Sequence, residues 1–246
     1  MFNMKNHLGI GIAAVAVVIA SWILGYAFMH RNQSDNTIAV TGLGEKDFVA
    51  DLIVWNGSFS RKSTDLQAAY SQLDSDRQQI TQYLQSKGID SKEMVFSAVD
   101  IQKQFDENYN SETGVRTSTF TGYDLSQTVS IESKNVAKVE ELSRQVTELI
   151  NKGIEFESRA PNYYYTKLAD LKKQMISDAT KDARERAQNI AEKADADLGK
   201  LKKASMGVIQ ITGKNSAEDY SWGGAFNTTS KEKTASITIK LEYEVD

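Results

Sequence analysis

Apolar and polar positions divide the chain into two parts with different patterns. Residues 8–29 contain no charged side chain, whereas the rest of the chain mixes polar and apolar positions. At ~1.5 Å rise per residue this run forms a helix about 33 Å long, which matches the ~30 Å hydrocarbon core of a bilayer. The pattern predicts a tail at residues 1–7, a transmembrane anchor at 8–29, a polar tether at 30–36 and a domain at 37–246.

A cleavable export signal is the competing interpretation of the apolar run, because Lys5 precedes it as a charged residue precedes such a signal. Signal peptides have apolar regions of ~7–15 residues that end in a small-x-small cleavage site. This run is longer, and its only passable site is Gly25-Tyr26-Ala27. A helix buried in a soluble core is disfavoured by the same length and lack of polar residues. We therefore favour an uncleaved anchor.

The domain opens with an alternating pattern that is interrupted by glycines. Ile38-x-Val40 alternates, the pattern breaks at Gly42 and Gly44, and alternation then resumes. This arrangement predicts two strands joined by a glycine turn, which is a β-hairpin. Gly42-x-Gly44 lacks the third glycine and the following helix of a dinucleotide-binding fingerprint, so we interpret it as a turn.

The remaining elements follow from periodicity. Apolar residues at three- and four-residue spacing predict amphipathic helices, and alternating or β-branched runs predict strands. Helices are expected at residues 66–84, 136–150 and 166–196, and strands at 94–105, 117–131, 154–165, 199–212 and 234–245. The order ββαββαβαββ favours an α+β domain with three helices and a mainly antiparallel sheet. No Pro/Gly/Ser-rich linker interrupts this domain, so we expect one composite unit.

The last predicted helix changes character along its length. Its second half carries alanines at positions 179, 183, 187, 191 and 194. Such a slim face allows another element to approach closely. Asp178, Asp182 and Glu185 on the same helix alternate with basic residues, which is typical of a solvated, ion-paired face rather than of a carboxylate catalytic or metal site.

Composition excludes several kinds of chemistry. The chain has no cysteine, and its two histidines, His7 and His30, flank the apolar run. Catalytic triads of the usual kind and zinc sites built from these ligands are therefore not expected in the domain. A net charge of −4 with no basic stripe argues against a nucleic-acid partner. We predict no cofactor and no metal.

Aromatic residues are the candidate interaction residues. Tyr163 and Tyr165 share one face of a predicted strand, either as buried cross-strand partners or as a binding surface. Tyr220, Trp222 and Phe226 lie in the glycine-containing loop before the last strand. Aromatic residues on such a loop either contact a partner or fold back onto the domain.

Small residues in the apolar run indicate a second interaction surface. Gly9, Ala13, Ala16 and Ala20 are spaced by four, three and four residues. This spacing places them on one helix face and lets helices pack closely in lipid. The edges of a hairpin-built sheet, in a chain with a single proline, would add a second route to self-association. We therefore expect a homo-oligomer.

Several short motifs occur together in a particular order. They are Ile38-x-Val40-x-Gly42-x-Gly44, the helix end at residues 84–89, Phe120-Thr121-Gly122-Tyr123 and the alanine repeat followed by Leu198-Gly199. With these motifs, the chain from about Thr37 to Val245 resembles the SIMPL-domain family of bacterial periplasmic and cell-envelope proteins. The resemblance implies an α+β fold, a loose association with oxidative-stress tolerance and, in some members, ring-like or channel-like homo-oligomers. No catalytic residues are established for the family, so none is carried over.

The expected function follows from these features taken together. We expect a single-pass, non-enzymatic protein of the bacterial cytoplasmic membrane, whose domain lies on the periplasmic or extracytoplasmic side and self-associates. The charges that flank the apolar run nearly balance, so this orientation rests partly on the family resemblance. The alternative is an envelope ligand-binding module with an aromatic pocket, whose small-molecule ligand the sequence does not identify. A carboxylate-dependent envelope hydrolase is the third possibility.

Overall fold

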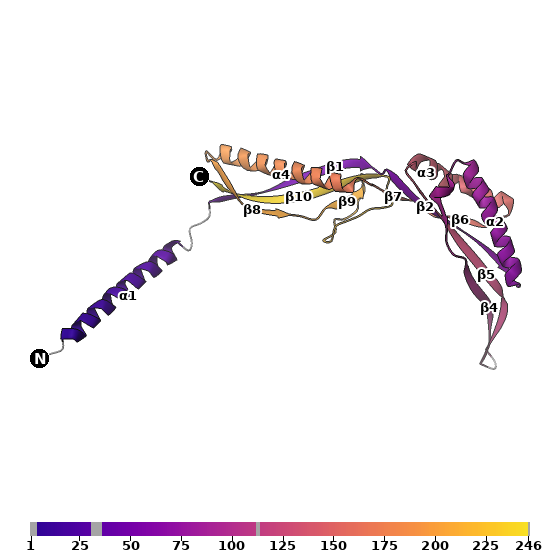
Figure 1. Cartoon of the computed structure of the whole chain (residues 1–246), viewed down its shortest axis with the longest axis horizontal. Coiled ribbons are helices and arrows are strands. Elements are labelled where there is room, and N and C mark those ends of the chain that lie inside the picture. Colours follow the sequence, from indigo (N-terminus) through magenta and orange to yellow (C-terminus); the bar gives the residue numbers. More distant parts are fainter. Residues whose placement is uncertain (1–3, 31–35, 112–113, 246) are drawn as a thin grey trace. The chain divides into compact units, whose positions relative to one another are not determined.

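A computed structural model describes residues 4–30, 36–111 and 114–245 of the chain, with side chains at 14–29, 36–109, 111 and 114–245 (Figure 1). Within these residues the fold is α+β with mainly antiparallel strands, as predicted. Residues 1–3 of the predicted tail and 31–35 of the predicted tether lie outside the described residues.

The elements follow the predicted order, with several short strands in addition. The α-helices are α1 (Met4–His30), α2 (Leu66–Ser86), α3 (Val136–Gln145) and α4 (Leu168–Lys193), and two 3-10 helices occupy Ser91–Glu93 and Val146–Lys152. The first strands are β1 (Thr37–Val49), β2 (Leu52–Ser63), β3 (Met94–Phe96), β4 (Asp100–Asn110) and β5 (Val115–Ser133). The later strands are β6 (Phe156–Ser158), β7 (Asn162–Tyr164), β8 (Leu198–Met206), β9 (Gln210–Gly213) and β10 (Glu232–Val245).

Helix α1 contains the whole predicted apolar run. Its described side chains are exposed, including Trp22 and Phe28. Ala16 and Ala20 of the predicted small-residue face are exposed, and the side chains of Gly9 and Ala13 lie outside the described residues. In the part of the chain that the structure describes, no helix is both long enough and apolar enough to cross a membrane.

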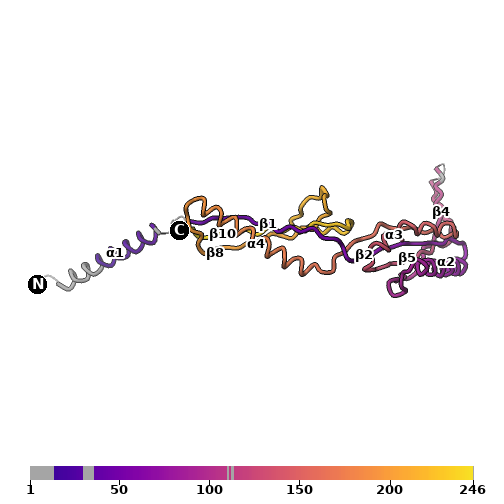
Figure 2. Tube along the Cα trace, turned by 90° about the horizontal axis from the view of Figure 1, so that it is seen from above, coloured from indigo at the N-terminus to yellow at the C-terminus, as the bar shows by residue number. Residues whose placement is uncertain are grey.

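The strands form two sheets. In the first, the order is β1-β10-β8, with β9 also pairing with β10; in the second it is β3-β5-β2-β6, with β4 on β5 and β7 on β2. The predicted hairpin of β4 and β5 is confirmed, with Asp106 opposite Thr119. The predicted opening hairpin is wrong, because β1 pairs with β10 while β2 pairs with β5. β1 and β10 run side by side although they begin and end the domain (Figures 1 and 2).

The glycines of β1 serve close packing and do not form a turn. β1 continues through Gly42 and Gly44 to Val49. A Cβ atom on Gly44 would lie 2.3 Å from the carbonyl oxygen of Met175 and 3.2 Å from the Cβ of Ala179, both in α4. A side chain at this position would therefore push the helix off the strand. The predicted slim face of α4 is confirmed, since Ala179, Ala183, Ala187 and Ala191 are all fully buried.

The second sheet has a conventional hydrophobic core on one face. Helices α2 and α3 cover β2 and β5 (Figure 1). Trp55 and Phe59 from β2, Leu73 from α2 and Val139 from α3 belong to one buried cluster. Asp65 caps the start of α2 by accepting a hydrogen bond from the backbone N–H of Ala68 at 2.7 Å. The prediction of helices on one face holds for this sheet.

Two compact units divide the chain. One comprises residues 1–42, 183–205 and 240–246, and the other comprises residues 43–182 and 206–239. The sequence predicted one composite domain because it contains no linker. The boundaries fall inside β1, α4, β8 and β10, so continuous strands and a continuous helix connect the units. That is why composition does not mark the boundaries.

We expect Gly44→Ala to lower the free energy of unfolding by about 1–3 kcal/mol, because the added methyl group overlaps the Met175 carbonyl oxygen. Urea unfolding followed by circular dichroism would measure the change. Gly223→Ala is the matched control, since no atom lies within 4 Å of its added Cβ. An equal loss in both variants would contradict the close-packing explanation.

Candidate functional site

The predicted aromatic loop connects β9 to β10 and folds back along β9. The backbone N–H of Ile211 donates to the carbonyl oxygen of Ala225 at 2.8 Å, and the N–H of Asn227 donates to the carbonyl oxygen of Ile211 at 2.9 Å. Residues 225–227 thus run beside β9, and Phe226 forms a parallel bridge with Ile211. The loop is therefore held by backbone hydrogen bonds as well as by side chains.

Gln210 holds the apex of this loop. Its side-chain amide donates to the carbonyl oxygen of Ser221 at 2.8 Å. Its side-chain oxygen accepts from the backbone N–H groups of Ser221, at 3.2 Å, and Ala225, at 2.7 Å. One side chain on β9 thus fixes both sides of the turn that carries Trp222.

A groove of about 460 Å³ lies under the apex of the loop. Tyr220 and Trp222 line it together with Leu43, Val208 and Ile237. The side chain of Trp222 is 100% exposed, and Tyr220 and Val208 are also exposed. The volume suits a small ligand, and the aromatic and aliphatic lining suits an apolar one. This aromatic groove is the candidate binding site.

A buried lysine supports the base of the loop. Lys233 is only 2% exposed, and its Nζ donates to the backbone oxygen of Asn227 at 2.5 Å and to the Oδ1 of the same residue at 3.1 Å. Asn227 in turn donates to Glu218, which also accepts from the backbone N–H of Gly213 at 3.1 Å. Burial lowers the pKa of Lys233 to about 8, and the nearby charge of Glu218 opposes this shift.

The predicted aromatic residues do not gather at a single site. Tyr220 and Trp222 line the groove, whereas Phe226 lies with Tyr163 and Tyr165 around a separate small cavity. Tyr163 is buried, and its hydroxyl donates to Glu140 at 3.4 Å. Burial and the charge of Glu140 raise the pKa of this phenol. The buried-strand interpretation is therefore confirmed for Tyr163.

Tyr165 and Asp182 also have structural partners. The ring of Tyr165 packs against Phe48, with their centroids 4.8 Å apart. Asp182, which the sequence placed on a solvated helix face, accepts a hydrogen bond from the backbone N–H of Leu43 at 2.8 Å. It thereby satisfies a donor of β1. Among the described residues, no group of three or more histidine, aspartate or glutamate side chains is arranged to hold a metal ion.

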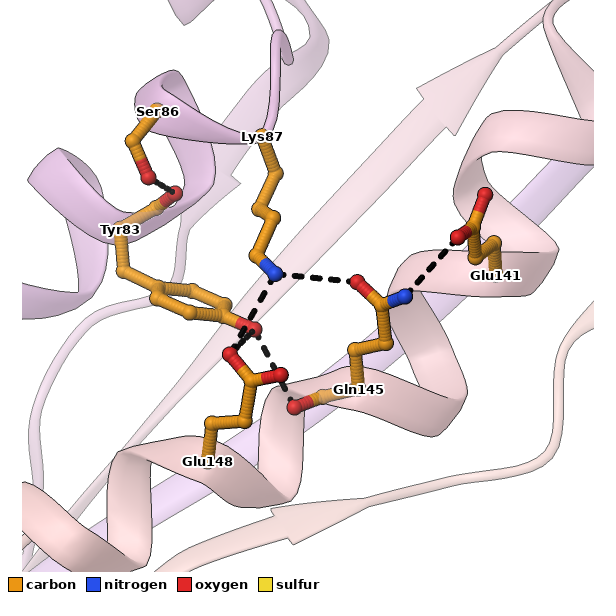
Figure 3. Close-up of polar contacts among 6 residues, drawn as sticks. All are labelled: Tyr83, Ser86, Lys87, Glu141, Gln145 and Glu148. Atoms are coloured by element: carbon orange, nitrogen blue, oxygen red, sulfur yellow. Dashed lines mark hydrogen bonds and ion pairs between the residues drawn. The ribbon is translucent and has the colours of Figure 1, made fainter.

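A second polar cluster joins α2 to α3 (Figure 3). Lys87 donates to the side-chain oxygen of Gln145 at 3.0 Å and forms an ion pair with Glu148 at 3.3 Å. The hydroxyl of Tyr83 donates to the same glutamate at 3.2 Å and to the backbone oxygen of Gln145 at 3.1 Å. Burial and the bond to Glu148 raise the pKa of Tyr83. These contacts fasten two helices over the sheet, and they hold the tyrosine away from a role as a proton donor near neutral pH.

Sequence reasoning missed Gln210 and Lys233. The position of Lys233 has a readable signal, because it shares the alternation of Ala235, Ile237 and Ile239 on the buried face of β10. A lysine in that phase of a strand predicts a buried charge that needs partners. Gln210 has no comparable signal, since its role depends on where the loop returns.

The SIMPL family, described as a protein of unknown function (DUF541), has a model that matches residues 38–245. The chain belongs to the SIMPL family. The match runs from β1 to β10, so the SIMPL domain includes the groove, the buried lysine and residues of both compact units. Most of α1 precedes the match. A comparison with curated protein sequences found no match to the chain.

We expect Lys233 to make the stability of the SIMPL domain rise between about pH 8 and the ordinary lysine pKa of ~10.4. In this window the folded state releases the proton that the unfolded state still binds, so higher pH favours folding. Urea unfolding from pH 7 to 10 should show a steeper rise for the natural chain than for Lys233→Met. Lys240→Met, on an exposed position of the same strand, should keep the natural slope. A slope unchanged by Lys233→Met would contradict the depressed pKa.

Proposed function

We propose that the chain is a membrane-anchored, non-enzymatic protein of the cell envelope that self-associates through its SIMPL domain. The observation that carries this proposal is the exposure of large apolar side chains on the strands and the loop of the domain. Trp222 is 100% exposed, Tyr109 62%, Val115 54% and Phe105 52%. Soluble monomers rarely leave extensive apolar patches in water, and association covers them.

The anchor in this proposal rests on the sequence of α1. Residues 8–29 carry no charge, and the exposed side chains of α1 at residues 14–29 are mainly apolar. A helix of this kind gains stability by entering lipid or by packing against other helices. Gly9, Ala13, Ala16 and Ala20 would then provide the packing face between anchors. The proposed location of the domain is the periplasmic side of the cytoplasmic membrane.

The non-enzymatic character is supported by the chemistry of the domain. Both histidines lie outside it, and cysteine is absent from the chain. The two polar clusters described above use their side chains to hold the aromatic loop and to join α2 and α3. A link to stress tolerance rests on the family resemblance alone and stays a proposal.

Mass measurement of the detergent-solubilised full-length chain tests self-association. We expect a multimer of defined mass, beside a chain that begins at Thr37 as the comparison. Assembly of both forms would assign the interface to the SIMPL domain, whereas assembly of the full-length form alone would assign it to the anchor. Monomers in both samples would contradict the proposed function.

Ligand binding is a second candidate function, favoured by the groove beside Trp222. If the groove takes apolar ligands, an anilinonaphthalene dye should bind the full-length chain, and Trp222→Ala should weaken binding about 3- to 10-fold through the loss of an aromatic contact. Tyr70→Ala, at an exposed tyrosine of α2, should leave binding unchanged. Equal effects of the two substitutions would rule out the groove as the binding site.

A further inference from the structure

The β4–β5 hairpin extends beyond its sheet as a two-stranded ribbon (Figure 1). The pairing of β5 with β2 ends where Tyr123 lies opposite Ser63. Before that point, residues 115–122 of β5 pair only with β4 among the described strands, and β4 itself pairs only with β5. The outer edge of β4 is therefore open along its whole described length.

The ribbon exposes apolar side chains as well as backbone. Phe105 and Phe120 contact each other edge to face at 5.7 Å, yet both remain exposed, as do Tyr109 and Val115. A two-stranded ribbon is marginally stable in water by itself, and an open edge is a template for another strand. The charges of β4 are Asp100, Lys103, Asp106 and Glu107, so this edge is acidic with a net charge of −2.

Strand β8 is an open edge of opposite charge. It ends the order β1-β10-β8, so one of its edges has no partner among the described strands. Residues 200–206 are all exposed, including Leu201 and Met206. Its charges are Lys200, Lys202 and Lys203, which give +3 with no acidic residue; Lys202 also lies 3.8 Å from Glu244.

We propose that the acidic edge of β4 in one copy of the chain pairs with the basic edge of β8 in a second copy. The two strands have 11 and 9 residues, lengths that match at ~3.3 Å per residue. Opposite charge favours this pair, while like charge disfavours pairing of β4 with β4 or of β8 with β8. The backbone supplies the hydrogen bonds, and exposed apolar side chains of the ribbon and β8 become covered.

This interface determines the kind of assembly. The contact joins two different surfaces, so each copy keeps one free β4 edge or β8 edge for the next copy. A repeated contact of this type closes into a ring or grows into a filament. The inference rests on the self-association proposed above and assigns it to named strands of the SIMPL domain.

Charge reversal in the full-length chain tests the pairing. The β8 variant carries Lys200→Glu and Lys203→Glu, and the β4 variant carries Asp106→Lys and Glu107→Lys. In detergent, we expect each variant to lose the multimer that the natural chain forms and to run as a monomer. Lys172→Glu with Lys173→Glu reverses two exposed charges on α4 and should leave the multimer unchanged.

Recombination separates a specific interface from damage to the fold. An equal mixture of the β4 and β8 variants should regain the multimer, because each reversed edge then meets a complementary one. A chain that carries all four reversals should also assemble. Natural-size multimers of the single-edge variants would overturn the pairing while self-association stands, and so would monomers that fail to recombine. A monomeric natural chain would overturn both proposals.

Discussion

Close contact between a glycine-containing strand and an alanine-faced helix is the constraint on which the first sheet depends. Gly44 leaves no room for a side chain between β1 and α4, and the buried alanines continue the slim helix face over three further turns. Larger residues on either element would separate them and expose the buried face of β10. The packing therefore rests on what both elements lack, and side-chain volume is added elsewhere, in the aromatic and aliphatic core of the second sheet.

The sequence predicts the helices and most strands because their signals are local. Asp65 and Gly88 mark the ends of α2, and the β4–β5 hairpin follows from two β-rich runs around a turn. The opening hairpin was predicted wrongly because a glycine in a strand gives the same signal for a turn as for close helix packing. Which of the two applies depends on α4, more than 120 residues later in the chain.

The candidate site could be predicted only in part. Tyr220 and Trp222 stand out in the sequence because aromatic residues in a polar, glycine-containing loop are unusual. The sequence did not separate them from Phe226, which faces Tyr163 and Tyr165, because that separation depends on how the loop folds back along β9. The same return brings Asn227 over Lys233 and Ser221 over Gln210, contacts that alternation within one strand does not reveal.

The pairing of β1 with β10 has a consequence for the order of folding. These strands are the first and last of the domain, so the first sheet lacks its central strand until the final residues of the chain are available. The second sheet, with most of its strands and both of its helices between residues 52 and 164, has no such requirement. A chain that emerges from its N-terminus would therefore complete the second sheet early and hold β1 unpaired until synthesis or export ends. During that interval a newly made copy depends on chaperones or on slow dilution to avoid pairing its open strand with another chain.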